Sequence, residues 1–344
     1  MAYKLPLYQL DYFLKEICGD RTVFVPEQTE GDCHLVRADA WDPEKHTLGT
    51  SRPVEPLKSL VFRPREFLGE LEGTSEIRPM EDRIVLGVKN CDLSALKIQD
   101  HVFLESEPVD PYYAQAREKT LIISCDCIDC REVCFCPVVN EQPYAKDGFD
   151  INISATPLGY VIDTGSERGE RAIKPARQHL EVADDAILEA REAAREWLYH
   201  RVVDQASKKG LKPGLNFQKA IRESARSRFW NTLAEDCVEC GACNLVCCTC
   251  HCFLLADGLS KDGVPARVKQ WDSCLYRNFA RVAGGGNPRS HRAERLHNRF
   301  DKKFDYFPQI LNRYACDGCG RCIEACTGKI DIREVLKSAL GMGH

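Results

Sequence analysis

The sequence contains no long hydrophobic run, and this absence bounds where we expect the protein to act. None of its apolar stretches approaches 18 residues, so the sequence predicts no helix that crosses a membrane. The first 20 residues include polar side chains throughout and lack a small-residue cleavage site, unlike a secretory signal. We therefore expect a cytoplasmic protein that does not insert directly into a membrane.

An excess of basic residues is also missing, and so are the common nucleotide-binding motifs. The formal net charge is −5, which argues against nucleic-acid binding. There is no Gly-x-Gly-x-x-Gly, and the glycines at 284–286 are not followed by the Gly-Lys-Ser/Thr of a phosphate-binding loop. No acid/base pair or nucleophile constellation is evident either. The sequence therefore predicts no catalytic residues, and any two-electron chemistry would occur on another chain.

Cysteine, in contrast, is abundant, with 20 in a chain of 344 residues. Such a density is typical of disulfide frameworks in small secreted domains, but this chain is large and has no export signal. Cysteines in this setting usually bind metal. The length favours two domains, and a hydrophobic content of 44% is enough for a core in each.

We predict an α+β fold with two parts. Residues 1–211 should form an N-terminal α/β-type domain that includes the cysteine cluster 125–136, and residues 212–344 an all-helical dicluster ferredoxin domain. Lys212-Pro213-Gly214 is the linker candidate, and no convincing strand follows it. In the first part, strand-type runs and a hairpin pair precede a long helix at 184–209. The strand-type segments are 22–25, 60–63, 83–88, 121–124, 149–155 and 160–164.

A cysteine motif of the form C-x2-C-x2-C-x3-C occurs twice, at 237–247 and 316–326. In two-cluster ferredoxins the first three cysteines of such a run bind one cluster and the fourth ligates the other. The spacing therefore predicts two [4Fe–4S] clusters held by iron–thiolate bonds. Cluster 1 takes Cys237, Cys240, Cys243 and Cys326, and cluster 2 takes Cys316, Cys319, Cys322 and Cys247.

Zinc is the alternative metal for these eight cysteines. Structural zinc sites use four ligands, commonly as two separated C-x2-C pairs, which two triple runs fit poorly. Gly241 and Gly320 each follow the second cysteine of a run, where the absence of a Cβ lets the backbone approach a cluster. Both features favour iron–sulfur clusters.

The remaining cysteines predict a third [4Fe–4S] cluster, with zinc and unligated thiols as the alternatives. The C-x-C pairs at 134–136 and 250–252 place two sulfur atoms on one side of an extended segment. Cys18 and Cys33 are interpreted as ordinary apolar residues, His251 is a further possible ligand, and Cys248 has no assigned role. The candidate ligands of the third cluster are Cys127, Cys134, Cys136, Cys250, Cys252 and Cys274, together with Cys91 at a strand-to-helix turn.

Four arginines, at 289, 292, 295 and 299, recur at helical spacing on one face. A solvated helix face is the simplest interpretation of this row. Docking to an acidic partner and compensation of the negative charge of the clusters are the alternatives.

The chain resembles a known family, the iron–sulfur subunits shared by cytosolic sulfhydrogenases, where they are the beta chain, and by anaerobic sulfite reductases. The resemblance spans most of the chain, and segments between the cysteines make it specific. The chain departs from the family pattern in its extra thiols Cys125, Cys130 and Cys248. Cys248 occupies a position where relatives carry proline. The segments that carry it are Asn90–Leu93, Asp110–Tyr113, Cys127, Cys134–Cys136, 148–150, 165–170, 237–252, Trp271–Cys274, 283–286 and 316–326.

The resemblance implies an electron-transfer subunit of an anaerobic oxidoreductase complex. Electrons would pass between a flavin subunit that binds NAD(P)H, or a ferredoxin, and a catalytic hydrogenase or reductase subunit. Two rival hypotheses remain. The surplus cysteines could form a special cluster or thiol pair that itself reduces a disulfide or sulfur compound, or the chain could be a zinc-stapled interaction module.

Overall fold

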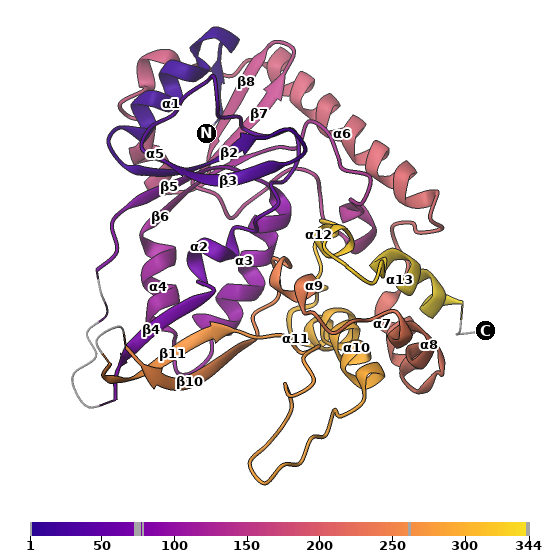
Figure 1. Cartoon of the computed structure of the whole chain (residues 1–344). Coiled ribbons are helices and arrows are strands. Elements are labelled where there is room, and N and C mark those ends of the chain that lie inside the picture. The colour runs from indigo at the N-terminus through magenta and orange to yellow at the C-terminus, as the bar shows by residue number, and fades with distance from the viewer. Residues whose placement is uncertain (1, 72–76, 78, 261–262, 342–344) are drawn as a thin grey trace.

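The computed structural model of the chain describes residues 2–71, 77, 79–260 and 263–341, and it has a sheet-based half and a helical half (Figure 1). The sheet-based half is built on eight strands in the order β3-β2-β5-β6-β7-β8-β1-β9, of which β2, β5, β6 and β7 run parallel. The strands are β1 (Ala2–Leu5), β2 (Thr22–Gln28), β3 (Cys33–Ala38), β5 (Arg83–Val88), β6 (Thr120–Cys125), β7 (Ile151–Thr156), β8 (Gly159–Thr164) and β9 (Glu181–Val182).

Helices cover both faces of this sheet, as its buried strands require. Alternate residues of β5 face opposite cores: Ile84 packs in the core that contains α1, and Val85 in the core that contains α3 and α4. This period of two explains why β5 and β6 are buried along their whole length. The helices of this half are α1 (Leu10–Cys18), α2 (Lys58–Val61), α3 (Asn90–Phe103), α4 (Pro111–Glu118), α5 (Glu167–Ala172) and α6 (Asp185–Ser207).

The helical half follows α6 and surrounds a separate hydrophobic core built mainly by α7, α8, α10 and α13. A π-helical turn at Lys302–Tyr306 connects α10 to α11. None of the helices in the described ranges is both long enough and apolar enough to cross a membrane. The helices of this half are α7 (Phe217–Glu223), α8 (Phe229–Glu235), α9 (Ala242–Leu245), α10 (Arg292–Asp301), α11 (Phe307–Leu311), α12 (Arg321–Glu324) and α13 (Ile332–Leu340).

The α+β fold class is confirmed, but two details of the sequence prediction are wrong. The run at 60–63 is not a strand, because Leu60 and Val61 lie in α2, from which Val61 packs against the second face of the sheet. Strands also follow residue 214: β10 (Phe253–Leu259) pairs with β11 (Pro265–Trp271), so the second half is not all-helical.

These two late strands also connect the halves of the molecule. β11 pairs antiparallel with β4 (Arg65–Glu70), so one three-stranded sheet contains segments from both sides of the predicted boundary at 211/212. The partner strand of β11 lies far away in sequence, which is why a local pattern did not reveal it. The halves are therefore joined by backbone hydrogen bonds as well as by side chains.

Candidate iron–sulfur sites

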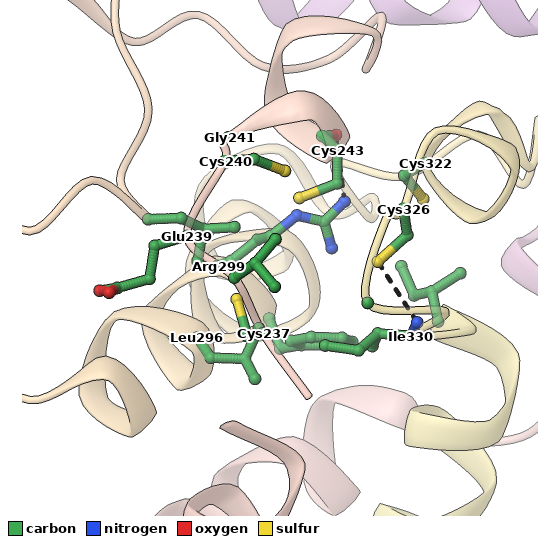
Figure 2. Close-up of a pocket in the computed structure, with 15 residues that line it drawn as sticks. Cys237, Glu239, Cys240, Gly241, Cys243, Leu296, Arg299, Cys322, Cys326 and Ile330 are labelled. Atoms are coloured by element: carbon green, nitrogen blue, oxygen red, sulfur yellow. Dashed lines mark hydrogen bonds between the residues drawn. The ribbon is translucent and has the colours of Figure 1, made fainter. Parts of the chain in front are cut away.

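The first cysteine site is a cavity in the helical half, lined by the four predicted ligands of cluster 1. In Figure 2 the sulfur atoms of Cys237, Cys240, Cys243 and Cys326 surround a common space. Cys322 also contributes to the wall, but its sulfur atom points away from the other four. The backbone N–H of Ile330 donates to Cys326 Sγ over 3.3 Å. The structure therefore brings together the set that the crossed motif predicts.

Two glycines set the backbone conformation of the two cysteine motifs. Gly241 and Gly320 have φ values of +72° and +73° and precede α9 and α12, the short helices that contain the third cysteine of each run. A Cβ on Gly241 would lie 2.6 Å from Cε1 of Tyr276, and one on Gly320 would lie 2.5 Å from the carbonyl oxygen of Val133. Only glycine combines the left-handed backbone with such close approach.

The second site contains Cys247, Cys316, Cys319 and Cys322, the predicted ligands of cluster 2. Cys322 interacts electrostatically with Cys247 and Cys319, and Cys316 with Cys247 and Cys322, so the four thiols are neighbours. The buried Lys303 donates from Nζ to Cys247 Sγ over 3.2 Å. Cys247 therefore lies with the second motif rather than with the rest of its own run.

A third cavity lies where the two halves meet. It is lined by Cys91, Cys127, Cys130, Cys134 and Cys136 from the first half and by Cys319 from the second motif. Cys91, a secondary candidate from sequence, is part of this wall because α3 begins beside the loop that follows β6. The structure does not bring Cys250, Cys252 and Cys274 to this cavity.

Two of those cysteines, Cys250 and Cys274, instead contact the buried Asn244. Asn244 Nδ2 donates to Cys274 Sγ over 3.1 Å, and Cys250 Sγ donates to Asn244 Oδ1 over 3.7 Å. Cys252 and Cys274 are hydrogen-bonded to each other, and this bond lowers the pKa of Cys274 to about 6. Cys250, Cys252 and Cys274 thus form a group separate from the third cavity.

Buried cations accompany each of the three sites. Arg299 lies at the first cavity, where its Nε donates to Asn244 Oδ1 over 2.9 Å. Lys303 lies at the second site and Arg52 at the third cavity, where Arg52 Nε donates to the carbonyl oxygen of Cys319 over 2.7 Å. Lys58 donates to the carbonyl oxygens of Asn244 and Cys250. Apart from Arg299, sequence reasoning missed these cations, because nothing in their local sequence marks them.

The arginine row at 289–299 does not form a solvated face. Arg295 and Arg299 are buried, and Arg292 Nη1 donates to the carbonyl oxygen of Cys237 over 2.7 Å. Arg295 donates to the carbonyl oxygens of Arg289 and Leu275. Arg299 lines the first cavity, whereas Arg295 forms an ion pair with Glu239. Compensation of the charge of a cluster is therefore favoured for Arg299.

Burial and positive charge act in opposite directions on these thiols. Burial raises the pKa of Cys243 to about 12, and Arg299 opposes this shift. Burial likewise raises the pKa of Cys134 to about 12, with Arg52 opposing it. Low-dielectric surroundings disfavour a lone thiolate, whereas iron ligation and a nearby cation both stabilise it.

The other notable residues have ordinary surroundings. Cys18, Cys33 and Cys125 are buried, and Cys18 and Cys125 belong to the first hydrophobic core. The ring of His251 contacts the backbone, with its Nδ1 3.2 Å from the carbonyl oxygen of Thr249. Burial lowers the pKa of His251 to about 4. Cys248 donates to Asp317 Oδ2 over 3.4 Å and lies 3.9 Å from Cys319 Sγ. It is thus a thiol beside a predicted ligand.

The residues present fit [4Fe–4S] clusters. Within the described ranges, no group of three or more His, Cys, Asp or Glu side chains converges on a single metal-ion position. The thiols of the first and third sites instead line the walls of cavities. Thiolates spaced around a volume, with backbone N–H groups and cations turned toward them, are the surroundings that an iron–sulfur cluster requires.

The comparisons with known proteins agree with this geometry. Residues 236–330 match the family described as the 4Fe-4S dicluster domain, so the class of protein is an iron–sulfur protein with two [4Fe–4S] clusters in its second half. The chain is also 32% identical over 293 residues to sulfhydrogenase 2 subunit beta of Pyrococcus furiosus, covering 84% of each chain. The chain belongs to the sulfhydrogenase beta subunit family, as its resemblance predicted. No solved structure matches it.

Proposed function

We propose that the chain is the electron-transfer subunit of a multi-subunit oxidoreductase and that it carries three [4Fe–4S] clusters in a row. One observation supports the order of the three clusters. The middle group shares a wall with each neighbour, because Cys322 also lines the first cavity and Cys319 also lines the third. A continuous series of cysteine sites is what passage of single electrons across a protein requires.

Each proposed cluster has a defined set of cysteine ligands. Cys237, Cys240, Cys243 and Cys326 would hold cluster 1, and Cys247, Cys316, Cys319 and Cys322 would hold cluster 2. For the third cluster we propose Cys91, Cys127, Cys134 and Cys136, with Cys130 beside them as a non-ligand. When bound, such clusters supply one-electron redox chemistry. The chain's own residues exclude water, donate hydrogen bonds to sulfur and place Arg52, Arg299 and Lys303 beside the thiolates.

The partners proposed from this arrangement stand at the two ends of the row. One is the electron donor, either a flavin subunit that binds NAD(P)H or a ferredoxin, and the other is a catalytic hydrogenase or reductase subunit. The similar protein from Pyrococcus furiosus is named as a beta subunit of a sulfhydrogenase, which supports assembly with other subunits. We propose a cytoplasmic complex on the same ground, with this chain as a relay rather than the catalytic centre.

Iron counting after anaerobic purification tests the assignment. We expect about twelve iron atoms per wild-type chain, and about eight in each of Cys326→Ala and Cys91→Ala, because each variant loses one cube. Cys130→Ala is the matched control and should keep about twelve, since the third cluster needs only four thiolates. About eight irons in the wild type, or full iron in Cys91→Ala, would contradict the third cluster, and a colourless zinc protein would contradict the relay.

A further inference from the structure

We propose that the segment 276–292, called here the arginine loop, docks the acidic face of a small soluble one-electron carrier protein at cluster 1. This inference rests on the proposed relay and adds the kind of protein that exchanges electrons with its first site. Three observations support the docking proposal: the position of the loop, its charge, and the exposure of the cavity rim beside it.

The arginine loop begins and ends at the wall of the first cavity. Leu275 lines that cavity, and the next residue, Tyr276, is the side chain that packs on Gly241. At the other end, Arg292 Nη1 donates to the carbonyl oxygen of Cys237. Between these ends the chain projects as a long loop between β11 and α10 (Figure 1). A protein bound to this loop would therefore lie directly against the site of cluster 1.

The charge of the arginine loop has one sign. It contains Arg277, Arg281, Arg289 and Arg292 and no Asp or Glu. Arg277 and Arg281 are exposed, and none of the four guanidinium groups forms an ion pair with a carboxylate of the described residues. The amino group of Lys302 lies over the ring of Phe279, 5.9 Å from the ring centroid. Lys302 therefore adds a fifth positive charge beside the arginine loop. Such a patch attracts an acidic surface and accelerates its encounter.

The rim of the first cavity is the most accessible part of the cysteine sites. All twenty cysteines lie in the described part of the chain, and Cys240 alone among them is exposed. Its neighbour Val238 is 57% exposed, and so is Val282 on the arginine loop. Because an electron crosses only a short span of protein efficiently, the exposed ligand marks the point where a carrier can exchange an electron with the row.

The composition of this surface favours a carrier that binds transiently over a permanent subunit. The cores of permanent interfaces are apolar and depleted in charge, whereas electron-transfer encounters are small and dominated by electrostatic complementarity. The arginine loop is rich in arginine and glycine and offers few apolar side chains, of which Val282 is the most exposed. These features match the transient class.

Stopped-flow reduction of the cluster-loaded full chain tests the proposal. The probe is a chemically reduced small acidic ferredoxin, mixed anaerobically at a series of salt concentrations. We expect the second-order rate constant of the wild type to fall steeply with salt, and the double variant Arg277→Glu/Arg281→Glu to react about tenfold more slowly at low salt. The rates of the two proteins should converge at high salt. Arg277→Gln/Arg281→Gln should give an intermediate rate.

A matched control makes the same change of charge elsewhere. Arg171→Glu/Lys174→Glu alters two exposed residues at α5, at the far end of the molecule (Figure 1), and should leave the rate within about twofold of the wild type. Equal slowing of both double variants, or a wild-type rate that does not depend on salt, would overturn the proposal. Cosedimentation with vesicles of phosphatidylcholine and phosphatidylserine that depends on Arg277 and Arg281 would overturn it too, because the loop would then serve a membrane surface.

A second reductant separates this inference from the proposed function. A small mediator without net charge should reduce the clusters of every variant at the wild-type rate. If it does so and the ferredoxin shows neither the salt dependence nor the effect of the variants, only the docking proposal fails. If neither reductant reduces clusters in the wild type, the relay itself fails.

Discussion

The first and the third cysteine cavities have different origins. The first is built by one run of 237–243 together with Cys326, all within the matched dicluster domain. The third takes Cys91 from the start of α3, the 127–136 loop from the end of β6, and a wall at Gly318 and Cys319 from the other half. The difference teaches that a sequence motif encodes the first site, whereas the third exists only when the two halves are docked.

Of the variants considered, Arg321→Met should have the largest effect, and it should affect the third site before the first. Arg321 and Asp92 form a buried ion pair across the two halves, with 2.7 Å between Nη2 and Oδ2. Removing the cation leaves the Asp92 carboxylate buried and unpaired, which should lower the free energy of unfolding by about 3–5 kcal/mol. Anaerobic urea unfolding of the cluster-loaded protein measures this loss, and iron of the third site should be lost before iron of the first.

The control for this variant is Arg171→Met, an exposed arginine in α5, which should change the unfolding free energy by no more than about 0.5 kcal/mol. Adding Asp92→Leu to Arg321→Met should recover part of the loss, because the unpaired carboxylate is then gone. A loss below about 1 kcal/mol in Arg321→Met would mean that this ion pair does not hold the halves together.

Gly318→Ala should have the next largest effect. Gly318 has a φ of +65°, and a Cβ there would lie 2.5 Å from Cα and N of Cys136. Gly214 also has a positive φ, +85°, but its Cβ would meet nothing within 4 Å. Gly214→Ala should therefore cost only the left-handed backbone penalty of about 1–2 kcal/mol, whereas Gly318→Ala adds the overlap.

Iron analysis of these two glycine variants sharpens the comparison of the cavities. Gly318→Ala should lose the iron of the third site, because Cys136 must shift, and should keep that of the first. Gly214→Ala should keep all of its iron. Equal destabilisation and full iron in both variants would show that the approach of Gly318 to Cys136 is not needed for the third site.

The smallest effect should come from Lys303→Met, which changes redox behaviour more than folding. The Lys303 ammonium, 3.2 Å from Cys247 Sγ, stabilises the more negative, reduced state of cluster 2. Its removal should lower the reduction potential of that cluster by on the order of 60 mV, which corresponds to a tenfold change in a one-electron equilibrium. Redox titration followed by electron paramagnetic resonance measures the shift. The exposed Lys97→Met is the control, and an equal shift in both variants would contradict the assigned role.

Much of the fold was predictable where the pattern is local. The buried strands β5 and β6, the β7–β8 hairpin and the long helix α6 lie where hydrophobic periodicity predicts them. The strand β11 was missed because its partner β4 comes from the other half. The run at 60–63 was misread because a short apolar run fits a strand and a buried helical turn equally well.

The candidate sites divide in the same way. The eight dicluster cysteines were predicted from spacing alone. For the third cavity, the fold retained the candidates Cys91, Cys127, Cys134 and Cys136, added Cys130 and left out Cys250, Cys252 and Cys274. The arginine row lies on a helix only from Arg292 onward, because α10 begins there and Arg289 precedes it. The interpretation as a solvated face was wrong, because periodicity shows which residues share a face and not what that face contacts.

The sequence by itself determined that this protein binds iron–sulfur clusters, because each of its two motifs supplies three thiolates at spacings of three residues and a fourth that completes the other cluster. The tertiary structure alone decided which surplus thiols meet, which cations lie beside them and in what order the sites follow one another. Those relations depend on contacts between segments far apart in sequence, such as Arg321 with Asp92 and Gly318 with Cys136. Such contacts form only when burial of both cores brings the two halves together.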